Sequence, residues 1–291
     1  MKVVQFEHVT PVRGLEHRGG TFYSHTTAAG VPGTAGNFKF SISELGTDYS
    51  GPRHRHNFDQ YRYMLSGESD YGQDGPLRAG MLGYYPEGVP YGPQVNNTPI
   101  VCAVLQFGGA SGSGYLQPRE VKAGMEELKK FGEFKDGIFT RRADVPGKRN
   151  MDAYQAIWEH VHGREMIYPK GRYDAPIMMD AASYQWAPIK SAPGASEKLF
   201  GVFTERRTEA RLVKLASGAS YQVAGRGVYL VLSGGGEADG QPLKKFTTVF
   251  LEMDEHTPLR ASETTELLHY GLPDLADMEM GYTGAAVQAA E

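Results

Sequence analysis

Short runs of alternating apolar and polar residues occupy the first part of the chain. The clearest runs are residues 38–42 (FKFSI) and 61–65 (YRYML). Alternation with a period of two places successive side chains on opposite faces of a β-strand. Glycine-rich turns at 72–75 and 108–109 separate such runs. The stretch from 38 to 109 is therefore predicted to form a β-rich unit.

The pattern changes to a helical period after this unit. Between residues 119 and 131, lysines and glutamates separate apolar residues at helical spacing, namely Val121, Met125, Leu128 and Phe131. A second helix is predicted at 151–162, where one side carries Ala153, Ala156, Ile157 and Val161. We expect the two helices to link or cover two β-units.

A second β-pattern begins near residue 209. Residues 229–234 (YLVLSG) resemble residues 63–67 (YMLSG), which indicates a weak internal repeat. The chain is therefore predicted to have four parts. These are an N-terminal β-unit at 1–115, a helical linker or cover at 116–185, a second β-unit at 186–275 and a tail at 276–291.

Composition narrows the class of protein. The 291-residue chain is long enough to bury an ample core, and its 30 basic and 34 acidic residues give a formal charge of −4. That balance gives no reason to expect a nucleic acid or a membrane as partner. No apolar run approaches the length of a membrane span, and the N-terminus has no signal-peptide core. With a single cysteine, Cys102, in a strand-like run, the chain is predicted to be soluble and cytoplasmic.

A histidine pair is the strongest candidate for chemistry. His54 and His56 are two residues apart, so both imidazoles would point to the same face of a strand. On a straight strand Gln60 would lie roughly 13 Å beyond His56, so residues 57–59 are predicted to turn the chain. Neutral imidazoles suit first-row divalent ions, whereas two surface histidines are the alternative. A further ligand, Tyr91, would come from a distant strand.

The segment around the histidines resembles the first motif of the cupin superfamily. That motif has a His-x-His pair, a glutamate three or four residues later and a glycine after six more. Here His54 and His56 are followed by Gln60 and Gly67 at that spacing. Glutamine therefore stands where glutamate is usual.

A second segment resembles the second cupin motif. That motif has a glycine, five residues, Pro-x-Gly, two residues and a histidine. Here Gly80 is followed at that spacing by residues 86–88 (PEG) and by Tyr91. Tyrosine therefore stands where histidine is usual.

The resemblance implies an all-β fold of two cupin-type jelly-roll barrels joined by a short helical segment. It also implies a mononuclear site in the first barrel with the ligands His54, His56, Gln60 and Tyr91. One divalent transition metal is expected, with iron first and manganese, nickel or zinc as alternatives. Asp59 and Arg62 are expected to contact a ligand or the substrate, and a homodimer is expected.

The second barrel is expected to lack the ligands. Aligning Gly234 with Gly67 places Tyr221, Val223 and Gly227 where the first barrel has its histidines and its glutamine. Its expected role is packing, dimer contact or closure of the first pocket.

The resemblance implies a small-molecule metalloenzyme. The leading expectation is a mononuclear non-haem dioxygenase acting on an enolic, phenolic or carboxylate substrate, with Tyr91 as catalytic residue, either as ligand or as proton donor. The first alternative is a metal-assisted isomerase or lyase of a sugar acid or related carbonyl compound. The second is a bicupin that binds a small molecule without turnover.

Overall fold

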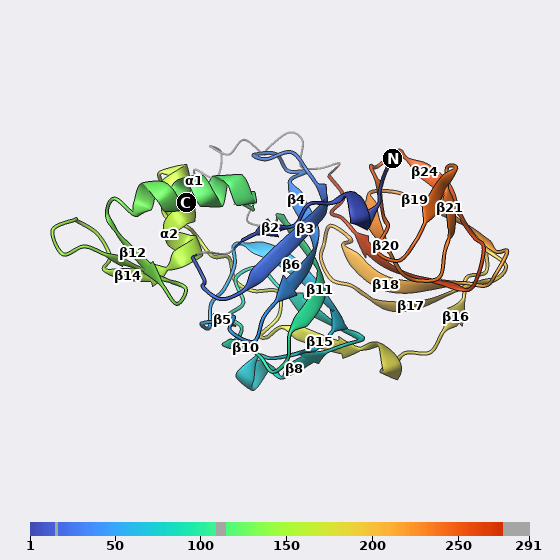
Figure 1. Cartoon of the computed structure of the whole chain (residues 1–291), viewed down its shortest axis with the longest axis horizontal. Helices are drawn as coiled ribbons and strands as arrows, with labels where there is room; N and C mark the ends of the chain where they lie inside the picture. Colours follow the sequence, from blue (N-terminus) through green and yellow to red (C-terminus); the bar gives the residue numbers. More distant parts are fainter. Residues whose placement is uncertain (15–16, 109–114, 276–291) are drawn as a thin grey trace. The chain divides into compact units, whose positions relative to one another are not determined.

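The computed structural model describes residues 1–14, 17–108 and 115–275 (Figure 1). Strands make up most of its regular structure. The two α-helices of these residues are α1 (Pro118–Leu128) and α2 (Ala153–His162). The expected all-β class is confirmed. No helix within the described ranges is long and apolar enough to span a membrane.

The chain divides into two compact units. The first unit consists of Pro11–Ser24 and Ala29–Met178, and the second of Met1–Thr10, His25–Ala28 and residues 179–275. The N-terminal residues belong to the second unit because β1 (Lys2–Val4) pairs with β23 (Thr248–Leu251). The predicted first β-unit, by contrast, began at residue 1. The predicted tail at 276–291 lies outside the described residues.

Two sheets enclose the core of the first unit. The large sheet has the order β15-β9-β6-β11-β4-β3-β2, and the small sheet the order β5-β10-β7-β8. Their bounds are β2 Val12–Arg13, β3 Phe22–Ala29, β4 Phe38–Leu45, β5 Ser50–Gly51, β6 Phe58–Ser66, β7 Glu68–Asp70, β8 Pro76–Arg78, β9 Met81–Tyr85, β10 Gln94–Asn96, β11 Ile100–Gly108 and β15 Ile177–Asp180. Met64 and Cys102 of the large sheet pack in one core with Leu77 of the small sheet.

The second unit repeats this arrangement. A seven-stranded sheet has the order β1-β23-β20-β25-β18-β17-β16, and a four-stranded sheet the order β19-β24-β21-β22. The remaining bounds are β16 Ala187–Pro188, β17 Ala195–Val202, β18 Glu209–Leu215, β19 Ser220–Ala224, β20 Gly227–Ser233, β21 Gly236–Ala238, β22 Gln241–Leu243, β24 His256–Ala261 and β25 Thr265–Gly271. Val213, Leu259 and Leu267 are fully buried in the core between the sheets.

Both predicted helices are present, and a small sheet separates them. The helix α2 begins after Asp152, whose carboxylate accepts hydrogen bonds from the first backbone N–H groups, and ends at Gly163 in the left-handed conformation. Between α1 and α2 lie β12 (Gly132–Lys135), β13 (Ile138–Arg141) and β14 (Asn150–Asp152). The described residues also form three 3-10 helices, η1 Phe6–His8, η2 Gly72–Asp74 and η3 Ala181–Ser183.

Within the first unit, an apolar cluster joins the helical segment to β6. Trp158 and Phe139 are fully buried in it, together with Phe58 from the start of β6. The Phe58 ring meets the edges of Tyr115 and Tyr154, at centroid distances of 5.2 Å and 5.7 Å. Because Phe58 lies two residues after His56, this packing places the helical segment next to the predicted site.

Candidate functional site

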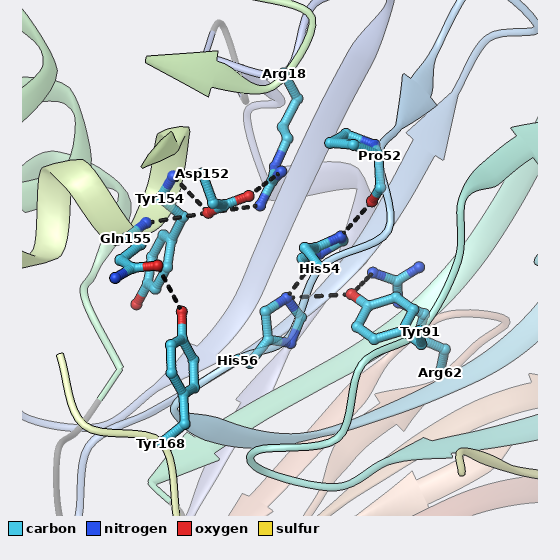
Figure 2. Close-up of polar contacts among 10 residues, drawn as sticks. All are labelled: Arg18, Pro52, His54, His56, Arg62, Tyr91, Asp152, Tyr154, Gln155 and Tyr168. Atoms are coloured by element: carbon cyan, nitrogen blue, oxygen red, sulfur yellow. Dashed lines mark hydrogen bonds and ion pairs between the residues drawn. The ribbon is translucent and has the colours of Figure 1, made fainter. Parts of the chain in front are cut away.

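One β-bridge joins the two sequence motifs. His54 and Tyr91 lie opposite each other in antiparallel orientation. The His54 N–H donates to the Tyr91 carbonyl at 3.1 Å, and the Tyr91 N–H donates to the His54 carbonyl at 2.8 Å. The Gly88 N–H also donates to the His56 carbonyl at 2.8 Å. The backbone of the second motif therefore holds Tyr91 beside both histidines (Figure 2).

Three side-chain atoms converge at this bridge. Nε2 of His54 lies 3.1 Å from Nε2 of His56, and Oη of Tyr91 lies 3.1 Å from the same His56 atom. Two atoms bonded to one ion at about 2.0–2.1 Å, in octahedral or tetrahedral geometry, lie about 2.9–3.4 Å apart. The two separations therefore fit neighbouring positions around a single small divalent ion.

The three converging atoms cannot all be satisfied by hydrogen bonds to one another. Nδ1 of His54 lies 2.7 Å from the Pro52 carbonyl oxygen, so Nδ1 carries the hydrogen and Nε2 is an acceptor. Nε2 of His56 can donate to His54 or accept from the Tyr91 hydroxyl, but it cannot do both. Nδ1 of His56 is buried without a hydrogen-bond partner among the described residues. A cation between the rings would satisfy the two Nε2 atoms and the Tyr91 oxygen together.

Burial keeps the three side chains neutral. It lowers the pKa of His54 to about 3, with Arg18 adding to the effect. It also lowers the pKa of His56 well below its ordinary value. Burial raises the pKa of the Tyr91 hydroxyl, although the Arg62 guanidinium acts in the opposite direction. Neutral imidazole is the form of histidine that binds metals, and a neutral phenol can donate a proton.

The chain turns earlier than predicted, and Gln60 lies on a regular strand. The turn predicted at 57–59 is wrong, because β6 already begins at Phe58. The change of direction occurs in the irregular segment that carries the histidines, where the bridge holds the backbone. The Gln60 amide lies 2.7 Å from Nε2 of Gln106 and 2.8 Å from Nε of Arg62. Its hydrogen bonds therefore go to these two residues.

Arg62 orients the Tyr91 hydroxyl from inside the first unit. Its guanidinium donates to Oη of Tyr91 at 3.2 Å, to Oη of Tyr71 at 2.6 Å and to Oε1 of Gln94 at 2.8 Å. All three acceptors are neutral oxygen atoms. The structure thus places Arg62, an expected neighbour of the site, in direct contact with Tyr91.

Asp59 lies on the opposite face of β6. Its carboxylate accepts from the Tyr84 hydroxyl and from the Glu87 N–H, both at 2.9 Å. It also forms an ion pair with Arg172 at 3.1 Å. The expected contact with a histidine is not formed, because adjacent residues of a strand point to opposite faces and Asp59 precedes the inward-facing Gln60.

An ion pair beside His54 was not predicted from the sequence. Nη1 of Arg18 donates to Asp152 at 2.7 Å, and Asp152 also accepts from the N–H groups of Tyr154 and Gln155 at 2.9 Å and 3.1 Å. Figure 2 shows Arg18 and Asp152 on the side of His54 away from Tyr91. A helix-capping aspartate was a readable signal for Asp152. Arg18 carried no comparable signal.

Residues 137–173 cover the histidine segment. A Cβ atom at Gly137 would lie 2.8 Å from Cδ of Pro52, so the turn between β12 and β13 packs directly on that segment. The Arg55 guanidinium lies 3.9 Å from the centroid of the Tyr168 ring. A Cβ atom at Gly88 would lie 2.3 Å from the Pro169 carbonyl oxygen. We call residues 137–173 the cover.

Asp152→Ala is expected to lower the free energy of unfolding by about 3–5 kcal/mol, because it leaves the buried Arg18 cation without its partner. The loss of the helix cap adds about 0.5–2 kcal/mol. Asp152→Asn retains an acceptor for the cap and should lose less. Urea denaturation followed by circular dichroism measures both variants.

The control for that prediction is Asp144→Ala, which removes a carboxylate that is 74% exposed in its pair with Arg142. Its effect should stay within about 0.5 kcal/mol. If Asp152→Ala is as stable as this control, the pair does not hold the helix to the site.

The donor set of the site is unusual. Among residues 1–14, 17–108 and 115–275, no group of three or more histidine, cysteine, aspartate or glutamate side chains is arranged to hold a metal ion. The converging atoms belong to two histidines and a tyrosine, so the third donor would be a phenol oxygen. In the second unit, the aligned positions Val223 on β19 and Gly227 on β20 carry no donor side chain.

No protein-family model and no curated protein matches the sequence. Solved structures do match. A candidate dioxygenase from Nostoc punctiforme has a TM-score of 0.65 at 12% identity, over 96% of this chain and 84% of that chain. Streptomyces albus HEPD, with 2-hydroxyethylphosphonate and Fe(II) bound, has a TM-score of 0.53 at 13% identity, over 95% and 77%. Escherichia coli pirin in complex with nickel(II) has a TM-score of 0.51 at 10% identity, over 94% and 98%. At these identities the likeness shows the fold.

Proposed function

The chain has the cupin fold of two jelly-roll units, and from this premise we propose that its first unit is the catalytic part of a small-molecule metalloenzyme. The reaction class we propose is that of a mononuclear non-haem dioxygenase. The observation that carries the proposal is the convergence of His54 Nε2, His56 Nε2 and Tyr91 Oη at separations of 3.1 Å.

The donor chemistry suits a first-row divalent ion. Imidazole nitrogen binds iron, nickel, copper and zinc, and a phenol oxygen is a harder donor. Iron is our first assignment, with manganese, nickel and zinc as alternatives. Similar structures that contain Fe(II) and nickel(II) support this choice. Gln60 would take part only by leaving its contacts with Gln106 and Arg62.

The chain's own residues would hold the site in a fixed geometry. The Pro52 carbonyl fixes the ring orientation of His54, and Phe58 stacks on His56 with a centroid distance of 4.2 Å. The Arg62 guanidinium fixes the Tyr91 hydroxyl at 3.2 Å. Partners of this kind orient ligands and tune their basicity. A bound ion would supply a redox-active centre at which an enolic, phenolic or carboxylate substrate and O₂ meet.

Tyr91 is the residue we assign to proton movement. Its hydroxyl can pass its proton to the substrate, and Arg62, which donates to the same oxygen at 3.2 Å, can stabilise that oxygen once the proton is given up. The cover would exclude water above the histidines. Excluding water strengthens the hydrogen bonds inside such a site.

The neutral Tyr91 hydroxyl also supports a second candidate function. A buried phenol beside a Lewis-acidic ion could act as general acid and base in a metal-assisted isomerase or lyase of a sugar acid or carbonyl compound. Such an enzyme would work without O₂ and with a metal that has no redox chemistry.

Metal analysis combined with O₂ uptake tests the proposal. The protein is purified without chelator, its metal content is measured, and O₂ consumption is followed with a panel of enolic and phenolic acids. We expect bound metal and substrate-dependent O₂ uptake with iron. Anaerobic turnover with zinc or manganese would favour the isomerase or lyase. Protein that binds no metal after incubation with any of these ions would contradict both assignments.

A further inference from the structure

Lys39 is a buried lysine on the inner face of the large sheet. Only 6% of its surface is exposed. On β4 it pairs with Gln106 of β11, and Gln106 pairs in turn with Gln60 of β6. The three side chains therefore form one row, on the face that also carries Cys102 of the core. Lys39 thus points to the interior of the unit that holds the histidines.

Among the described residues, no hydrogen bond or ion pair joins the Nζ atom of Lys39 to another group. Burying an uncompensated charge is costly, and burial accordingly lowers the pKa of Lys39 to about 8. At neutral pH the amine is therefore still mostly protonated. Within the described ranges this buried cation therefore has no counter-ion.

A second interior cation lies on the same face. Arg62 follows two residues after Gln60 on β6, and its hydrogen bonds go to phenol and amide oxygens. In the described part of the chain, neither Lys39 nor Arg62 contacts a carboxylate. The acidic residue nearest in sequence, Asp59, faces the other side of the sheet and pairs with Arg172. The inner wall of the first unit is therefore electropositive.

We propose that Lys39 anchors the acidic group of the substrate, a carboxylate that lies over the Gln60–Gln106 pair. Strands are about 4.8 Å apart, so Lys39 lies about 10 Å across the sheet from Gln60, with Gln106 on the strand between them. An acid bound by Lys39 would therefore lie against this amide pair. This inference deepens the proposed function, on which the word substrate rests. Binding of the acid itself requires no metal.

Binding of small acids to chelator-treated protein tests the proposal. The probes are pyruvate, malonate and benzoate, each compared with its uncharged methyl ester by isothermal titration calorimetry. We expect at least one acid to bind and its ester to bind much more weakly. Lys39→Met should weaken binding of the acid by about 30-fold or more, the effect of removing one partner of a buried charge pair. Lys39→Arg should retain part of the affinity.

The matched control is Lys190→Met, which makes the same substitution at an exposed position outside the cover and should leave acid binding unchanged. Stability separates loss of binding from loss of folding. Replacing a buried, unpaired charge by an apolar side chain of similar size is stabilising, so Lys39→Met should raise the melting temperature of the ligand-free protein. A variant that melts higher yet no longer binds the acid has lost its anchor and not its fold.

Three results would overturn the inference. They are binding of none of the three acids, equal binding by wild type and Lys39→Met, and borohydride trapping of an adduct between pyruvate and Lys39. The last would show an imine-forming amine. A protein that shows Lys39-dependent acid binding but holds no metal would refute the proposed metalloenzyme and leave this inference standing.

Discussion

Replacing both His54 and His56 by alanine is expected to abolish metal binding in the first unit. The two Nε2 atoms supply two of the three converging donors, and the remaining phenol cannot hold a divalent ion alone. Metal content after dialysis, measured by plasma mass spectrometry, should fall from a substantial fraction of one ion per chain to background. Substrate-dependent turnover should be lost with it.

The chain offers a matched control in a second His-x-His pair. His160 and His162 lie on α2, where residues two apart point in directions about 200° apart and cannot share an ion. Replacing both by alanine removes the same groups and should leave metal content unchanged. If the His54/His56 double variant retains its metal, the ion is bound elsewhere and the proposed centre is wrong.

Tyr91→Phe is expected to lower turnover by about 10²–10⁴-fold, because it removes the proton that we assign to catalysis. The ring stays in place, so the packing around it should survive. Metal affinity decides how the residue acts. If the phenol oxygen is a ligand, affinity should fall by about 10–100-fold or more, the loss seen for supporting residues of metal sites. If Tyr91 is a proton donor alone, affinity should hold.

Two further variants serve as controls for the Tyr91→Phe experiment. Tyr85→Phe removes a buried hydroxyl from a ring 4.5 Å from that of Tyr91 and should leave metal affinity and turnover within a few-fold of wild type. Tyr91→His introduces the ligand usual at this motif position and should tighten metal binding. A Tyr91→Phe variant with full affinity and full turnover would exclude Tyr91 from the site.

Sequence spacing predicted how the two motifs meet, but not the path of the chain between the proposed ligands. The positions of His54 and Tyr91 within the motifs placed them together, and the bridge joins them. Gln60 was assigned to the ion by analogy with a glutamate. In the structure the Gln60 amide forms a hydrogen bond with Gln106 on the neighbouring strand, a residue that is remote in sequence. Cross-strand partners of this kind depend on register, which the sequence of one strand does not reveal.

Alternation identifies a strand, but it does not show that both faces of a strand are buried. Residues 38–42 alternate apolar and polar side chains, yet both sides of this stretch are buried, Lys39 included. Periodicity can distinguish a core face from a solvent face. It cannot identify the orientation of a strand when neither face meets solvent. The Arg18–Asp152 pair escaped prediction for a different reason, because its members are 134 residues apart.

The cover has a consequence for how such a protein can diversify. The atoms that would hold an ion come from the bridged motifs, whereas the wall above them comes from a continuous stretch of chain that follows β11. The proposed ligands and the segment that covers them are therefore encoded in separable stretches of sequence. Under the proposed function, variation in the cover could change which substrates enter while the ligands stay the same, and a chimera that exchanges residues 137–173 should alter substrate preference before it alters metal content.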